Sequence, residues 1–350
     1  MKLYDLFSDV LKKEENWDYT KHTTENYDIS KLFTLPDSYN LIMELTFWDV
    51  NFHPLGIYLH SALEKIPPKR IAHTVSLYFL GISVCEKIGF DRFILPKWDN
   101  DPRRNFLHHW AGTCIFHDYG YYIEDNKELY PSCKYKTIDE LIPKLKIKYD
   151  LRSQLTINNK NLIDNYYKYR IEEHRIEKMG TIDHGIIGAL VLYDALMKRN
   201  EKMEEIAKTA CMFYEKQPYG DDNKKNIINY ASEIARHNMW FAEDNWIEIY
   251  KDSSLFDLIP KTDGSHKYRI NKSPTLYLLC LLDSLEPIKS YGQESLQKID
   301  IDISFSNEKL RIVITSPYND LYSNMKKCEE WLDLVVNQKN PETFEIIVQL

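Results

Sequence analysis

The chain has 350 residues, of which 43% are hydrophobic and 28% are charged, and its formal net charge is -8. This composition excludes a disordered chain and suits one large globular domain, or a domain with an appendage. The negative charge argues against a broad nucleic-acid surface, because phosphate backbones are bound by clustered Lys and Arg side chains.

The compartment is indicated by what the sequence lacks. Its first residues have no signal-peptide pattern, and the longest apolar run, 276–282, is far shorter than the roughly 18 residues that span a bilayer. No two cysteines have CxxC spacing, so we expect buried free thiols in a reducing, cytoplasmic environment. The six cysteines are Cys85, Cys114, Cys133, Cys211, Cys280 and Cys328.

Residues 1–66 are predicted to form an N-terminal helical extension packed on the core. Apolar residues recur at helical spacing between Leu3 and Leu11, and a second apolar segment covers 41–63. Pro67 and Pro68 interrupt the chain. A helix is then predicted over 71–87, with Gly89 as its stop.

The middle of the chain is predicted to be mostly helical. A loop at 99–104 leads into a helix at 105–116, whereas the charged segment 123–160 is expected to be an excursion that could cover a pocket. Four amphipathic runs then predict further helices. They lie at 182–198, 201–216, 221–241 and 275–285.

The pattern changes near residue 296. Residues 299–303 alternate strictly, 310–314 are β-branched, 322–336 have helical spacing, and 344–350 form another β-rich run. We therefore predict a mainly α protein with a small β-β-α-β appendage, and three segments: an extension (1–66), a helical domain (67–290) and the appendage (291–350).

Several ionisable residues interrupt the apolar faces of these predicted helices. His73 aligns with Leu77 and Leu80, and His184, His237 and Asp283 are placed in the same way. For any single histidine of this kind, a hydrogen-bonded core imidazole is the commoner explanation. For Asp283, a buried hydrogen-bond acceptor or a salt bridge between helices is an equal alternative.

The adjacent His117 and Asp118 lie between an apolar run and Gly120. Alone, the pair is also explained by a solvated helix end. Burying a carboxylate is costly unless it is paired or binds a metal, and imidazole together with carboxylate suits first-row metal ions. The whole set therefore predicts a metal site.

The order of these residues resembles the HD-domain superfamily of metal-dependent phosphohydrolases. The resemblance covers about 67–290 and includes the contexts TIDHGIIGALVLYDAL, ARHNMW and LCLLDSLEP. It implies an HD-domain-like helical bundle in which His73, His117, Asp118 and Asp283 bind one ion. Asp118 is then expected to bridge to a second ion held by His184 and His237.

One departure from the family concerns the residues after the HD pair. Many dinuclear members continue as HDxGK, whereas this chain keeps Gly120 and has Tyr121 in place of the lysine. A cation that contacts substrate must then come from elsewhere, and Arg236 is favoured because it adjoins His237. The other candidates, each of which is also explained as a surface residue, are Lys69, Arg70, Arg103 and Arg104. His109 is predicted to support the ligands or to donate a proton to a leaving group.

The favoured function is metal-assisted hydrolysis of a nucleotide or another small phosphoester, with one or two divalent ions. The donor set does not distinguish Fe, Mn, Zn, Mg or Ni. One alternative is a di-iron oxygenase of the same superfamily, which cleaves a C-C or C-P bond. Another is a metal-containing regulatory or binding module, in which an exposed edge at 299–303 pairs with a second copy, to give a homodimer, or with another protein.

Overall fold

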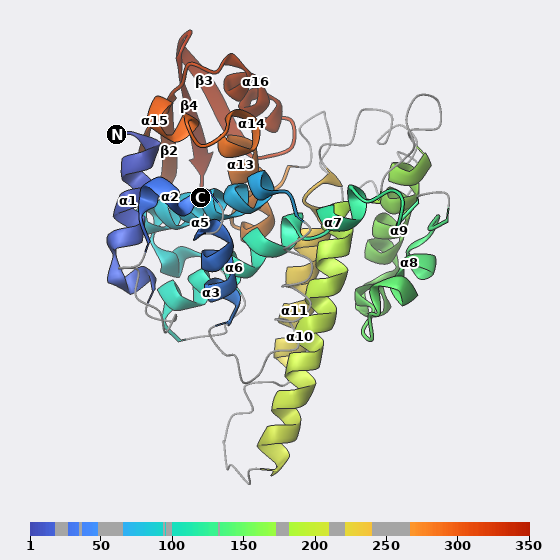
Figure 1. Cartoon of the computed structure of the whole chain (residues 1–350). Coiled ribbons are helices and arrows are strands. Elements are labelled where there is room, and N and C mark those ends of the chain that lie inside the picture. The colour runs from blue at the N-terminus through green and yellow to red at the C-terminus, as the bar shows by residue number, and fades with distance from the viewer. Residues whose placement is uncertain are drawn as a thin grey trace. The chain divides into compact units, whose positions relative to one another are not determined.

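The computed structural model describes residues 1–17, 27–34, 37–47, 66–93, 95, 100–131, 134–172, 182–209, 221–239 and 267–350, without the side chains of 43–47, 172, 202–209 and 221–223. The described chain is mainly helical and ends in a small antiparallel sheet, as predicted (Figure 1). The chain divides into two compact units, whose breaks include one between Ile66 and Pro67 but none at the predicted boundary near 290. Unit 1 contains residues 1–48, 67–115 and 260–350, and unit 2 contains 49–66 and 116–259.

The first unit contains both ends of the chain. Its described helices are α1 (Leu3–Lys12), η1 (Glu14–Asn16), α2 (Ile29–Leu32), α3 (Asp37–Phe47), α5 (Pro68–Ile88), η4 (Phe90–Arg92), α13 (Pro274–Leu285), α14 (Ile288–Tyr291), α15 (Ser295–Lys298) and α16 (Asn319–Cys328). A further helix, α6 (Pro102–Asp118), begins in this unit and carries its last residues into the second.

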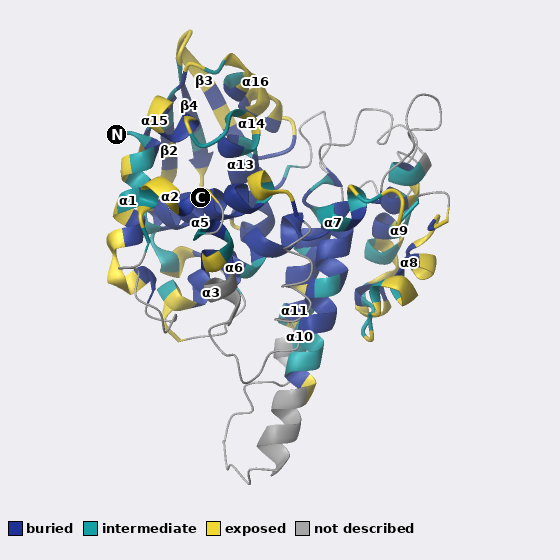
Figure 2. Cartoon of the chain, in the orientation of Figure 1, coloured by how far each residue is buried: buried dark blue, intermediate teal, exposed yellow. Residues whose placement is uncertain are grey.

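Helix α5 is the core of the first unit. It begins at Pro68, where a missing N–H costs nothing, and ends at Gly89, whose φ of 98° favours glycine, as the sequence predicts. Helices α1, α3, α13 and α14 and strand β1 pack against it, and it is buried along almost its whole length (Figure 2). Among the described helices it is the one that is long and apolar enough to cross a membrane, but 89% of that stretch is buried inside the protein, as in a core helix.

The C-terminal sheet has the strand order β1-β2-β4-β3, and all its pairs are antiparallel. The predicted helix at 322–336 is wrong at its end, because α16 stops at Cys328 and Leu334 already belongs to a strand. Leu334 and Val336 are buried while Val335 is exposed, a period of two that identifies the strand. The unit is therefore β-β-α-β-β. Its strands are β1 (Asp300–Ser306), β2 (Lys309–Thr315), β3 (Leu334–Asn340) and β4 (Thr343–Gln349).

The first residues of the chain lie along the start of β1. The N–H of Ile301 donates to the carbonyl of Met1 at 2.9 Å, and the N–H of Leu3 donates to the carbonyl of Ile299 at 3.0 Å. Lys2 forms an ion pair with Asp300 at 2.7 Å. The predicted open edge at 299–303 is thus covered at its beginning, and a homodimer through this edge stays a prediction.

The second unit is helical in its described part. Its elements are α7 (Tyr121–Glu124), α8 (Ile138–Leu145), η5 (Leu151–Gln154), α9 (Ile157–Glu172), α10 (His184–Thr209) and α11 (Asp221–Arg236). Helices α10 and α11 pack against each other, and η5 contacts both (Figure 1).

Two predicted boundaries in the second unit are wrong. The helices predicted at 182–198 and 201–216 form one continuous helix, α10, because no glycine or proline separates them. Residues 210–216 lie outside the described part. Helix α11 ends at Arg236, before the predicted end at 241. The excursion at 123–160 contains α8, which Thr137 and Glu140 begin with a capping box.

Four of the cysteines, Cys85, Cys114, Cys280 and Cys328, are buried free thiols, as predicted. Burial raises the pKa of Cys328 to about 12, so its thiol stays protonated at neutral pH. Cys133 and Cys211 lie outside the described residues.

A buried arginine joins three elements of the second unit. The side chain of Arg152 is 3% exposed, and its guanidinium donates to Asp164 at 2.8 Å, to Asp150 at 2.7 Å and to Asp139. These carboxylates belong to α9, to the residue before η5, and to α8. The guanidinium therefore fixes the packing of the excursion that follows α7.

We expect Arg152→Met to lower the free energy of unfolding by about 3 kcal/mol, because it leaves carboxylates without their buried partner. The midpoint of chemical denaturation measures this loss. Asp139→Asn is the matched control, since the Asp139 side chain is 81% exposed and its pair is expected to contribute less than about 1 kcal/mol. Equal effects of the two variants would show that Arg152 does not hold the three elements together.

Candidate metal centre

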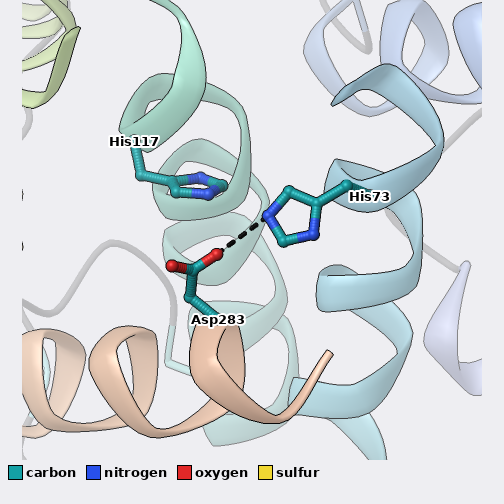
Figure 3. Close-up of side chains that lie close together, drawn as sticks. All are labelled: His73, His117 and Asp283. Atoms are coloured by element: carbon teal, nitrogen blue, oxygen red, sulfur yellow. Dashed lines mark ion pairs between the residues drawn. The ribbon is translucent and has the colours of Figure 1, made fainter. Parts of the chain in front are cut away.

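Three of the predicted ligands form a buried group. His73 on α5, His117 on α6 and Asp283 on α13 each offer one ligand atom, and these atoms all lie within 4.8 Å of one another (Figure 3). The Nε2 atom of His73 lies 2.9 Å from Oδ1 of Asp283. Among the described residues, this group could hold a metal ion, in agreement with the sequence prediction.

The ring of His73 is oriented by a carboxylate that the sequence analysis did not include. Its Nδ1 lies 2.6 Å from Oε2 of Glu286, and both side chains are fully buried. If Nδ1 donates its proton to Glu286, the lone pair of Nε2 is directed towards Asp283. This is the tautomer that a metal ligand requires.

In the second unit, Asp118 lies between two histidines. Its Oδ1 is 3.2 Å from Nε2 of His117 and 3.8 Å from Nε2 of His184. The ring of His237 lies 5.5 Å from that of His117 and 5.6 Å from that of His184, measured between centroids. All four residues are buried. The structure therefore brings the HD pair close to both additional histidines.

His184 is the first residue of α10 and is held on two sides. Its Nδ1 forms a very short contact with Glu124, which also accepts the backbone N–H of His184 at 3.1 Å. Burial alone would lower the pKa of His184, but the carboxylate of Glu124 raises it. Tyr121 stacks on the imidazole with a centroid distance of 3.8 Å. The residue at the position of the family lysine thus packs against a predicted ligand.

His237 is neutral and its tautomer is fixed by the backbone. It lies in the turn after α11, not on the apolar face of that helix, where the sequence places it. Its Nδ1 lies 2.7 Å from the carbonyl oxygen of Ile234, which can only accept a hydrogen bond. Burial, together with the nearby His117 and His184, lowers the pKa of His237 to about 3. The lone pair therefore resides on Nε2.

Two glycines bring the end of α6 against the start of α10. A Cβ atom on Gly120 would lie 2.2 Å from the carbonyl oxygen of His184, and one on Gly188 would lie 1.8 Å from that of Phe116. Neither position has room for a side chain, because the opposing atoms belong to the backbone. This close approach is what places His184 beside Asp118.

His109 does not lie with the predicted ligands. It precedes His117 by eight residues on α6, a separation of roughly 12 Å along a helix axis. Its Nε2 lies 2.7 Å from Oγ1 of Thr275, and burial lowers its pKa to about 3. The geometry is that of a neutral core imidazole, so the predicted role in proton donation has no support from its position.

The predicted cations also make contacts elsewhere. Nε of Arg236 donates to the carbonyl of Ser232, one turn back on its own helix. Arg103 donates to Asn16 at 2.9 Å, and Arg104 lies 3.9 Å from Asp101. None of these three contacts directs a guanidinium towards a predicted ligand.

The sequence analysis missed Glu286 and Glu124, the carboxylates behind His73 and His184. A signal was present, because Glu286 follows Asp283 by three residues and Glu124 follows the HD pair by six. Neither carboxylate interrupts an apolar helix face, which was the pattern used to select the other residues. Lys289, described below, was also missed.

Comparison with known proteins adds no relative. The chain matches no family model, no curated protein and no solved structure.

Proposed function

We propose that the protein is a metal-dependent phosphohydrolase that acts on a nucleotide or another small phosphoester. His73, His117, Asp118 and Asp283 would hold one divalent ion, and His184 and His237 would hold a second with Asp118, in an HD-domain-like arrangement. At such a site a metal ion polarises phosphoryl oxygens and lowers the pKa of a bound water.

One observation carries this proposal. In three buried histidines, Nδ1 lies within hydrogen-bond distance of an oxygen acceptor that is not itself a predicted ligand. The acceptors are Glu286 for His73, Glu124 for His184 and the carbonyl of Ile234 for His237. Nε2 is the remaining ring nitrogen in each case, and that of His184 lies 2.9 Å from the side-chain amide nitrogen of Asn238. A core imidazole needs only one partner, whereas the orientation of several rings by outer acceptors is typical of metal sites.

The chemistry of the donors also favours a metal. Asp118 and Asp283 are 2% and 7% exposed, and a buried carboxylate is costly unless it is paired or coordinates a cation. In the described geometry Asp283 is already paired with the imidazole of His73 and the ammonium group of Lys289. The cost of burial therefore favours a metal mainly at Asp118, which faces the imidazoles of His117 and His184. Imidazole and carboxylate together suit Fe, Mn, Zn and Ni, and carboxylates alone favour Mg. The identity of the metal therefore has to be determined by experiment.

The decisive experiment is elemental analysis of protein purified without chelator or added metal, followed by assays on a panel of phosphoesters. We expect one or two divalent ions per chain and release of phosphate or of a nucleoside monophosphate, with and without oxygen. The same assays without oxygen separate hydrolysis from the di-iron oxygenase, which consumes oxygen. Protein that contains no metal after reconstitution with each candidate ion would refute the proposal.

A further inference from the structure

Beside Asp283 lies a lysine that the sequence analysis did not consider. Lys289 on α14 places its Nζ 3.1 Å from Oδ1 and 3.2 Å from Oδ2 of Asp283. The carboxylate is 5% exposed and the lysine side chain 30%. The ammonium group therefore lies between a buried carboxylate and solvent, on the side from which a soluble ligand can reach it.

The position of Lys289 is fixed through Glu286. The carboxylate of Glu286 accepts the backbone N–H of Ile288 at 2.8 Å and that of Lys289 at 3.0 Å, and it also contacts His73 Nδ1. One fully buried side chain thus holds both the imidazole of His73 and the turn that carries Lys289. An ordinary surface ion pair has no such support, because its lysine stem is free to move.

A phosphoester substrate at the proposed metal centre would favour a nearby cation. The family lysine is replaced by Tyr121, which stacks on His184, and the described contacts of Arg103, Arg104 and Arg236 lead elsewhere. Phosphoester substrates carry oxygens with negative charge, and a lysine ammonium with three donors is a suitable partner for them.

From this geometry, and relying on the proposed hydrolase function, we propose that Lys289 is the cation that binds the phosphoryl group of the substrate. Glu286 is its positioning residue. Once a metal ion shares the charge of Asp283, the ammonium group is less strongly held by that carboxylate and can donate to a phosphoryl oxygen. Lys289, which follows the last predicted ligand Asp283, thereby takes the role of the lysine that the HDxGK pattern places after the HD pair.

The test uses Lys289→Met and Lys289→Arg in the full chain, with Lys298→Met as the matched control. Lys298 is 51% exposed and pairs with Glu294, away from the predicted ligands. Metal content is measured by elemental analysis, folding by thermal melting, and binding of inorganic phosphate to the metal-loaded protein by calorimetry. We expect Lys289→Met to keep the metal and to bind phosphate about 10- to 100-fold more weakly. Lys289→Arg is expected to retain most of the affinity, and the control all of it.

The outcomes separate the two proposals. If wild-type protein contains metal and hydrolyses a phosphoester, but Lys289→Met binds phosphate as wild type does, the role of Lys289 is refuted and the hydrolase proposal stands. Loss of metal in Lys289→Met would also refute it, because the lysine would then support the ligands instead of the substrate. Wild-type protein without metal or hydrolysis would overturn both.

Discussion

Asp118→Asn is expected to lower kcat/KM for phosphoester hydrolysis by at least about a thousand-fold and to reduce the bound metal. The Asp118 carboxylate lies between His117 and His184, and an amide of the same shape removes its charge without opening a cavity. Kinetics on the active phosphoester and elemental analysis measure the two effects.

The stability of the same variant distinguishes a functional from a structural role. Because Asn removes a buried charge, we expect the metal-free variant to melt at the same temperature as metal-free wild type or higher. Glu128→Gln, at an exposed position after α7, serves as the control and should behave as wild type. Full activity and metal content in Asp118→Asn would contradict the assignment of Asp118 as a ligand.

Gly188→Ala is expected to destabilise the second unit. In most helices this change stabilises by about 1 kcal/mol, because glycine is a poor helix former. Here the new Cβ would lie 1.8 Å from the carbonyl oxygen of Phe116, so α10 must move away from the end of α6. We expect a net loss of about 2–3 kcal/mol in the free energy of unfolding, measured by chemical denaturation.

The same displacement should weaken metal binding, because His184 on α10 and Asp118 on α6 would separate. Gly292→Ala is the comparison: its Cβ meets no atom within 4 Å, and only its φ of 74° opposes the change. A Gly188→Ala variant as stable as Gly292→Ala would show that the two helices do not need to approach so closely.

The long helices could be predicted from the sequence because their signals are local. Pro68 and Gly89 bound α5, and Pro274 and Pro287 bound α13, so each helix carries its own start and stop. The error at 322–336 has the opposite cause. Residues 334–336 are too few to distinguish a helical from a strand-like hydrophobic period in the sequence. Their strand conformation is decided by pairing with β4, which lies elsewhere in the chain.

The candidate site was predictable in its ligands but not in their supports. His73, His117 and Asp283 interrupt apolar helix faces, which is a local pattern, and the structure brings them together. Glu124 is the last residue of α7 and Glu286 is the C-cap of α13, and no local pattern shows which side chain each carboxylate contacts. Only the tertiary contacts distinguish a carboxylate that orients a histidine from one that is exposed to water.

The position of α5 has a consequence for how the first unit is assembled during synthesis. Its covering elements come from both ends of the chain, with α1 and α3 before it and α13, α14 and β1 about 200 residues later. Contacts so distant in sequence form slowly, and a helix as apolar as a membrane span stays exposed until the last of them arrives. Newly made chains that stop before α13 would therefore depend on chaperones to avoid aggregation through α5.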